Sequence, residues 1–69
     1  MNGMHTQTGW FRQDSDSWEK MINGTTYLIE REEGMFHLYR LLGWERIDCA
    51  KNFDAVAQSA YNYEGVDNE

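Results

Sequence analysis

The chain has 69 residues, and its twelve acidic and six basic side chains give a net charge of −6. This length allows one domain, residues 1–69, near the smallest size at which a hydrophobic core is stable by itself. The charge argues against direct binding to DNA, RNA or an anionic membrane, because neutralising phosphates requires lysine and arginine. It favours a protein partner with a basic surface, although such a charge also serves solubility alone.

The single cysteine, Cys49, cannot form an intramolecular disulfide, which points to a reducing compartment. The first nine residues contain neither a basic segment nor an apolar run, so they do not form a secretory signal. No stretch of the sequence approaches the length of a membrane span. We therefore expect a soluble, cytoplasmic protein.

The N-terminal part of the chain carries few signals of regular structure. Residues 1–8 are polar and unpatterned, and we expect a flexible tail. Residues 9–12, with Trp10 and Phe11, form either a short edge strand or a segment tucked against the sheet. Residues 13–17 predict a solvated turn, because Asp and Ser bind backbone groups outside regular structure. This turn lacks the further ligands of a calcium loop, so no metal site is expected.

The strongest local signal is Asn23-Gly24, which is typical of a type I′ turn between two antiparallel strands. A two-residue turn here pairs Ile22 with Thr25, Lys20 with Tyr27, and Trp18 with Ile29. Opposed residues share a face of the sheet. One face is therefore expected to carry Trp18, Ile22, Tyr27 and Ile29, and the other Glu19, Met21, Thr26, Leu28 and Glu30.

A second reversal is predicted at Glu33-Gly34. A two-residue loop pairs Ile29 with Leu38 and places Phe36, Leu38 and Leu42 on the face of Trp18. A three-residue loop would instead turn every side chain of the next strand to the opposite face. We favour the two-residue loop. Gly43 then marks either a bulge in one long strand or a turn into a short strand at residues 44–48, which we favour. The sheet thus spans residues 18–48 and has three or four strands.

Residues 53–64 predict one helix, because apolar residues recur there with helical spacing: Phe53, Val56, Ala57, Ala60 and Tyr61. Asn52 is the expected N-cap, Asp54 lies at the positive end of the dipole, and Gly65 follows the last turn. Residues 66–69 are expected to fray. The predicted fold class is α+β, an antiparallel three- to four-stranded sheet with one C-terminal helix packed on one face.

One helix covers only one face of such a sheet. The other face retains an apolar patch of Met21, Leu28, Tyr39 and Leu41, unless Trp10 and Phe11 fold over it. An uncovered patch of this kind is typical of an interface. We favour a homodimer over a foreign partner for it.

The sequence predicts no enzyme, no metal and no cofactor. His37 is expected in mid-strand near Glu30, and no basic partner accompanies Cys49 in the sequence to activate its thiol. Nucleotide, zinc and phosphate-loop motifs are absent from the sequence.

Carboxylates, in contrast, are predicted at both ends of the sheet, where alternate residues of a strand lie about 6–7 Å apart. Such a row presents negative charge to a basic groove much as a phosphate backbone does, and neighbouring Trp and Tyr side chains anchor the contact. The alternative is that these acids only keep an aromatic-rich protein dispersed. The candidate partner-binding residues are Asp14, Asp16, Glu19, Glu30, Glu32, Glu33, Glu45 and Asp48.

The order of these elements resembles that of many tiny proteins encoded by bacteriophages and mobile elements. The resemblance covers residues 18–64 and rests on the Trp18 strand, NGTTYLIERE, MFHLYRLLGW and the helix NFDAVAQSAYNYE. Short acidic members of that group include anti-CRISPR and other anti-restriction inhibitors. The resemblance implies an inhibitor in the host bacterial cytoplasm that binds a basic, nucleic-acid-binding surface of a CRISPR–Cas effector by occlusion or DNA mimicry. The alternative is a non-catalytic dimeric accessory or regulatory module.

Overall fold

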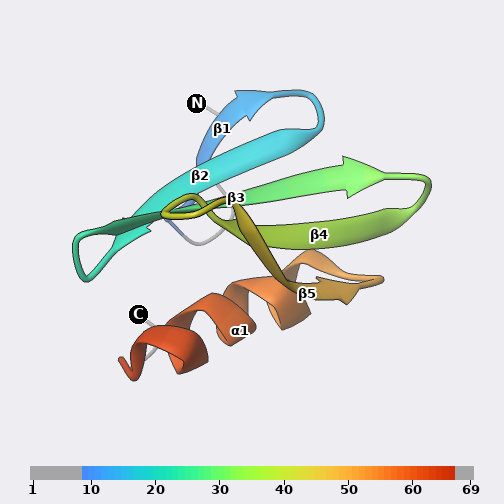
Figure 1. Ribbon diagram of the computed structural model, residues 1–69. Helices are drawn as coiled ribbons and strands as arrows, with labels where there is room; N and C mark the ends of the chain where they lie inside the picture. Colours follow the sequence, from blue (N-terminus) through green and yellow to red (C-terminus); the bar gives the residue numbers. More distant parts are fainter. Residues whose placement is uncertain (1–8, 67–69) are drawn as a thin grey trace.

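Five strands follow one another in a single antiparallel sheet, and one helix follows them, in the computed structural model, which describes residues 9–66 (Figure 1). The elements are β1 Phe11–Asp14, β2 Ser17–Ile22, β3 Thr25–Glu32, β4 Met35–Arg40, β5 Glu45–Ala50 and α1 Phe53–Glu64. The α+β class is confirmed. The expected strand number of three or four is wrong, since the sheet has five strands. The predicted tail at residues 1–8 and most of the one at 66–69 lie outside the described residues. The expectation that Val66 frays is wrong, because Val66 packs against the core and its amide donates a 3.0 Å hydrogen bond to the Tyr61 carbonyl oxygen.

The Asn23-Gly24 turn sets the register of the sheet as predicted. Asn23 has a φ of 56° and Gly24 a φ of 83°, the positive values that a type I′ turn requires. Strands β2 and β3 pair Ile22 with Thr25, Lys20 with Tyr27 and Trp18 with Ile29. The face expected to carry the large apolar side chains is therefore confirmed.

The second hairpin also follows the two-residue alternative. Glu33 and Gly34 have φ values of 56° and 79°. Strands β3 and β4 pair Ile29 with Leu38, so Leu38 points to the same face as Trp18 and is fully buried.

The third turn corrects the prediction for Leu42. Residues 41–44 form a four-residue turn, closed by a 3.0 Å hydrogen bond from the Trp44 amide to the Leu41 carbonyl oxygen. Gly43 thus lies in a turn, as favoured, but the next strand runs over Glu45–Ala50 rather than 44–48. Leu42 is 67% exposed because the turn interrupts the alternation that had placed it beside Trp18. A bulge lies further on, between Arg46 and Asp48 in β5, and the pairing of β1 with β2 shifts in register between Arg12 and Asp14.

The N-terminal segment combines the two alternatives left open for it. Phe11–Asp14 is an edge strand, and the predicted turn over 13–17 contracts to Ser15 and Asp16. The residue before this strand, Trp10, is fully buried and packs edge-on against Phe53 of α1, with ring centroids 5.9 Å apart. Trp10 therefore holds the edge strand to the helix.

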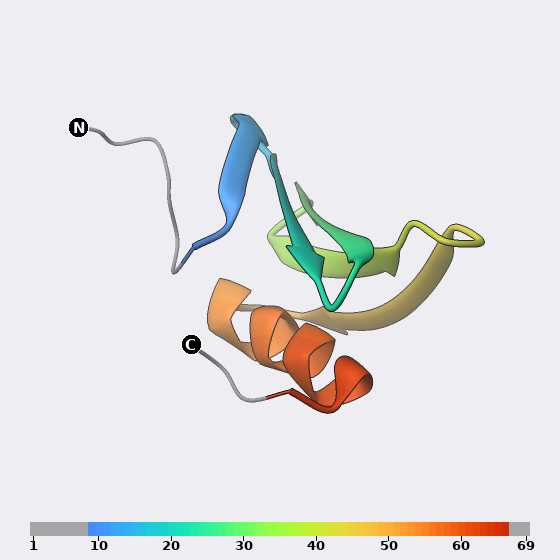
Figure 2. The ribbon, with the colours of Figure 1, turned by 90° about the vertical axis from the view of Figure 1, so that its left-hand side faces the viewer.

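The core lies between α1 and the concave face of the curved sheet (Figure 2). Its centre is the Phe53 ring, whose centroid lies 5.1 Å from that of Trp18 and 5.8 Å from that of Phe36. The buried side of the helix is the predicted stripe of Phe53, Val56, Ala57, Ala60 and Tyr61. Large rings thus supply much of the buried area in a chain of this size.

Both predicted ends of the helix are confirmed. The Asn52 side chain accepts a 2.8 Å hydrogen bond from the Ala55 amide, and Gly65 adopts a left-handed conformation with a φ of 73°. In residues 9–66, no helix is both long enough and apolar enough to cross a membrane.

Candidate functional site

The outer face of the sheet, which points away from α1, brings the two residues considered for catalysis together. The register pairs His37 with Glu30 on one side and with Cys49 on the other. The only side-chain hydrogen bond of His37 within residues 9–66 is with Arg46, whose Nη1 lies 3.4 Å from Nδ1. The Cys49 thiol makes no hydrogen bond to the imidazole in this part of the chain. Cys49 and His37 therefore lack the hydrogen bond between nucleophile and base that covalent catalysis uses.

Carboxylates gather at the end of the sheet formed by the β1–β2 and β3–β4 turns, on the right in Figure 1. A shallow depression there is lined by Asp14, Ser15, Asp16, Ser17, Glu30, Arg31 and Glu32. Glu33 lies in the adjoining turn and is exposed. The structure thus brings together five of the eight candidate acids, here called the acidic end: Asp14, Asp16, Glu30, Glu32 and Glu33.

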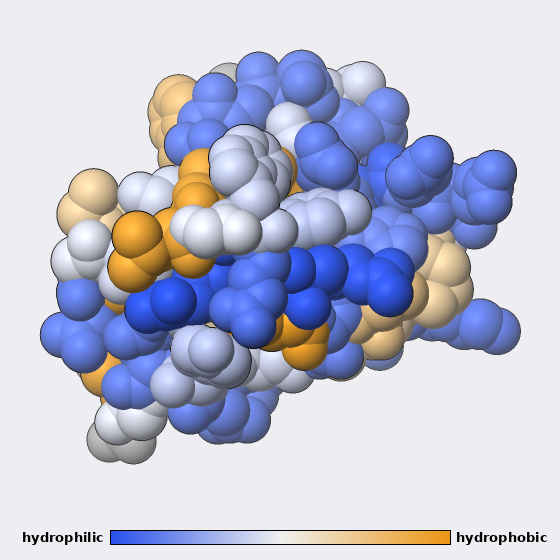
Figure 3. All heavy atoms as spheres, viewed as in Figure 1, coloured by the Kyte–Doolittle hydropathy of each residue, from blue (hydrophilic) through white to orange (hydrophobic). Residues whose placement is uncertain are grey.

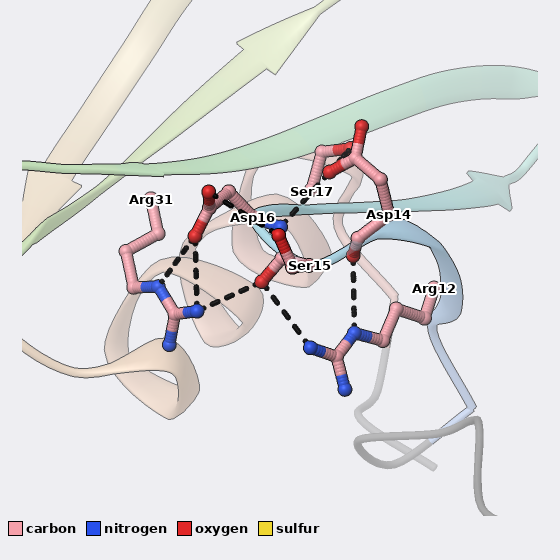
Figure 4. A network of polar contacts seen from close by, with 6 residues as sticks. All are labelled: Arg12, Asp14, Ser15, Asp16, Ser17 and Arg31. Carbon is pink, nitrogen blue, oxygen red and sulfur yellow. Dashed lines mark hydrogen bonds and ion pairs between the residues drawn. The ribbon is translucent and has the colours of Figure 1, made fainter.

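Two arginines hold the β1–β2 turn from either side (Figure 4). Arg12 donates to the carbonyl oxygens of Asp14 and Ser15, at 3.0 and 3.2 Å. Arg31 donates to the Ser15 carbonyl oxygen at 2.8 Å and forms an ion pair with Asp16 at 2.9 Å. Each guanidinium carbon also lies 5.7 Å from the centroid of the Trp18 ring. The turn is therefore tied to the core.

The charge of Asp14 is stabilised by its own turn. Its carboxylate accepts hydrogen bonds from the Asp16 amide at 2.9 Å and from the Ser17 hydroxyl at 3.0 Å. These bonds, the first above all, lower the pKa of Asp14 below its ordinary value. Asp14 therefore keeps its negative charge to a lower pH than an ordinary aspartate does.

The structure separates the other three candidate acids from the acidic end. Glu19 lies on the outer face and accepts a 3.1 Å hydrogen bond from Gln13. Glu45 is exposed at the start of β5, at the opposite end of the sheet. Asp48 accepts a hydrogen bond from Ser59 of the helix, so its carboxylate is engaged inside the fold.

The apolar patch expected on the outer face differs from its prediction. Met21 is 66% exposed and Tyr39 and Leu41 are half-buried, but Leu28 is only 8% exposed. Phe11 lines the same depression as Met21 and is itself 65% exposed, so both side chains remain open to solvent. The sequence reasoning missed Trp44, which is 67% exposed and packs its ring against Tyr39 with centroids 6.3 Å apart.

Most of the strongly hydrophobic atoms visible in Figure 3 lie in its left half, towards the end of the sheet that carries the 41–44 turn. The acidic end lies at the opposite end of the strands. The exposed apolar side chains are therefore separate from the acidic end, but Glu30 of the acidic end also lies on the outer face.

A partly buried polar cluster, also missed, joins the end of α1 to the sheet. Tyr27 donates its hydroxyl hydrogen to Glu64, Asn23 donates to the same carboxylate at 3.4 Å, and the Arg40 Nε lies 3.7 Å from it. A carboxylate in the last turn of a helix opposes the dipole, and this was the signal that Glu64 has a specific partner. Burial, followed by the bond to Glu64, raises the pKa of Tyr27 to about 12, and the Tyr27 hydroxyl lowers the pKa of Glu64.

This cluster predicts a loss of stability in acid. Because the folded state lowers the pKa of Glu64, its contribution is complete above the ordinary value of 4.5 and is lost as the pH falls through the folded-state value. The variant Glu64→Gln should therefore show a shallower fall in the free energy of unfolding below pH 4.5 than the natural chain. Urea titrations across that range, followed by circular dichroism, measure the difference. Equal slopes for the two chains would contradict the assignment.

Comparison of the chain with protein-family models, with curated proteins and with solved structures finds no match in any of the three. The candidate function therefore rests on the two surfaces described above.

Proposed function

We propose that this chain is a non-catalytic binding protein whose acidic end occupies a basic, nucleic-acid-binding surface of a partner protein. The observation that carries the proposal is the gathering of five carboxylates from two neighbouring turns at one end of the sheet. Opposite potentials of this kind steer encounter and set specificity.

The geometry of the acidic end suits such contact. Its two arginines are bound to the turn and to Trp18, whereas Glu32 and Glu33 make no side-chain bond within the described part of the chain. Glu30 and Glu32 alternate along β3, about 6–7 Å apart. Because the β1–β2 turn is held by hydrogen bonds, little freedom of that loop is lost when a partner binds.

The partner class follows from the resemblance to small acidic phage proteins. We propose a host-defence nucleoprotein, a CRISPR–Cas effector, whose DNA-binding groove accepts the acidic end in place of DNA. This places the protein in the cytoplasm of the host bacterium.

A second candidate function is a dimeric accessory or regulatory module. The observation that favours it is the outer face, where Phe11, Met21 and Trp44 are each about two-thirds exposed. Large exposed apolar side chains on one face are typical of interaction surfaces.

The test of the first proposal compares two charge reversals of equal size. Glu32→Lys changes the acidic end, and Glu45→Lys changes an exposed strand residue at the opposite end of the sheet. We expect Glu32→Lys to weaken binding to a purified CRISPR–Cas effector about tenfold and Glu45→Lys to leave it nearly unchanged. The measurement is competition with target DNA for the effector in a gel-shift assay.

Salt provides a second readout in the same assay. Affinity of the natural chain should fall as ionic strength rises, and by less in Glu32→Lys, because exposed charges are screened within about 10 Å at 0.1 M. Equal affinities of the two variants, or failure of the natural chain to displace DNA from effectors of every type tested, would refute the proposal.

A further inference from the structure

The polar residues of the outer face are divided by charge across the sheet. Three carboxylates, Glu19 of β2 and Glu30 and Glu32 of β3, lie on one half, and Arg46 of β5 and the imidazole of His37 of β4 lie on the other. One row across the strands reads Phe11, Glu19, Leu28, Tyr39 and Arg46, and the next reads Ser17, Glu30, His37 and Cys49. The boundary between the halves runs between β3 and β4.

We propose that this face binds a second copy of the same chain, about a two-fold axis that runs parallel to the strands and passes between β3 and β4. Such a rotation places each row of one copy against the same row of the second copy with the strand order reversed. Strand β3 then faces β4 of the second copy, and β2 faces its β5. Glu19 then meets Arg46 of the second copy, Glu30 meets its His37, and Leu28 meets its Tyr39. The surface is complementary to itself, which an isologous interface requires.

The unpaired charge of Arg46 supports this choice of partner. Two ion pairs are present in residues 9–66, Arg31 with Asp16 and Arg40 with Glu64, and neither includes Arg46. The only side-chain hydrogen bond of Arg46 there is with His37, so no carboxylate of residues 9–66 pairs with this arginine, although the chain has twice as many acids as bases. The second copy supplies one, in Glu19.

The same rotation covers the exposed apolar side chains. Met21 and Thr26 form the next row, and the Leu41 amide donates to the Thr26 carbonyl oxygen at 3.0 Å. Reversal of this row brings Met21 over the 41–44 turn of the second copy, where Trp44 is exposed. Burial of such side chains supplies the attraction, and the opposed charges fix the orientation.

This inference rests on the proposed function and extends it, because the dimer carries two acidic ends instead of one. An axis parallel to the strands leaves both chains running in the same direction, so the two acidic ends lie at the same end of the dimer. The second copy covers Glu30, and a partner groove then meets the remaining carboxylates of both acidic ends at once, so that the second contact becomes intramolecular. Repulsion between the two ends is limited by screening over about 8 Å at physiological ionic strength.

A charge exchange tests the pairing of Glu19 with Arg46. We expect the natural chain to sediment at twice its mass of 8.2 kDa, and Glu19→Arg and Arg46→Glu each to raise the dissociation constant of the dimer at least about tenfold. The double variant should regain the dimer. Lys51→Glu, an equal charge change at an exposed position outside the strands, should dimerise like the natural chain. Sedimentation equilibrium over a wide range of chain concentration measures this, with circular dichroism to establish folding.

Three outcomes would overturn the inference: a monomeric natural chain, single variants that remain dimeric, or a folded double variant that remains monomeric. A monomeric natural chain whose outer-face variants lose effector binding would assign this face to a foreign protein instead. A monomer that still displaces DNA from an effector would refute the dimer alone. A dimer that follows the charge exchange but binds no effector would refute the proposed function alone.

Discussion

Replacing Phe53 by alanine should abolish most of the stability of this fold. The Phe53 ring is 5% exposed and contacts the rings of Trp10, Trp18 and Phe36. Removing a buried phenylalanine costs about 3–5 kcal/mol, from the lost burial and the cavity left behind. A chain of this length has a total stability of roughly 3–10 kcal/mol, so a large fraction of Phe53→Ala molecules should be unfolded.

The matched control for this variant is Leu42→Ala, which also truncates a large apolar side chain. Leu42 lies in the exposed 41–44 turn, and its loss should change the free energy of unfolding by less than about 0.5 kcal/mol. Urea unfolding followed by far-ultraviolet circular dichroism measures both. If the two variants were equally stable, the aromatic centre would not be where the structure places it.

Truncation of Trp10 should also be severe, although this residue precedes the first strand. Trp10 is fully buried against Phe53, whereas its neighbour Phe11 is 65% exposed on the opposite face. We expect Trp10→Ala to cost about 3–5 kcal/mol and Phe11→Ala less than about 1 kcal/mol. The two variants differ by one position in the chain, so the comparison tests the direction in which each ring points.

The measurement for this pair is again urea unfolding, at a chain concentration low enough to exclude association through the outer face. Amide hydrogen exchange in β1 adds a local readout. Protection of Phe11–Asp14 should fall more than that of β3 in Trp10→Ala, because Trp10 holds the edge strand to the helix. A Trp10→Ala chain as stable as Phe11→Ala would show that the edge strand is held by its backbone hydrogen bonds alone.

The parts of the fold that were predicted from the sequence are those that short-range chemistry determines. Asn23-Gly24 and Glu33-Gly34 both take positive φ values, so each turn fixes the pairing of the strands beside it. The helix was predicted to the residue, because its stripe, its Asn52 cap and Gly65 are all local signals.

The sequence did not decide between an edge strand and a tucked segment for residues 9–12, because the stabilisation of this strand is not local. FRQD shows no alternation, since all four of its residues are exposed at the sheet edge. Its anchor, Trp10, acts through Phe53, which lies far along the chain. The predicted position of Leu42 was wrong for a related reason. Nothing in the sequence LLGW distinguishes a continued strand from a four-residue turn.

The candidate site was predicted in part. Asp14, Asp16, Glu32 and Glu33 lie in or beside turns that the sequence identifies, so their exposure was foreseeable. Their gathering at one end depends on β1 being a strand, which was left open. Asp48 was misplaced because its neighbour, Ser59 of the helix, becomes visible only once the helix is packed.

The order of the strands has a consequence for how the chain reaches this fold. Each strand pairs with the next one in the chain through a turn of two to four residues, so the sheet forms without closing any long loop. The entropic cost of closing these loops is therefore small. Sheets whose strands pair only with their neighbours in the chain fold faster than sheets with long-range pairing. Only the docking of α1, which brings Phe53 to Trp10 and Trp18, joins distant parts of the chain. Assembly should therefore proceed hairpin by hairpin, with the closing of the helix over the sheet as its slow step.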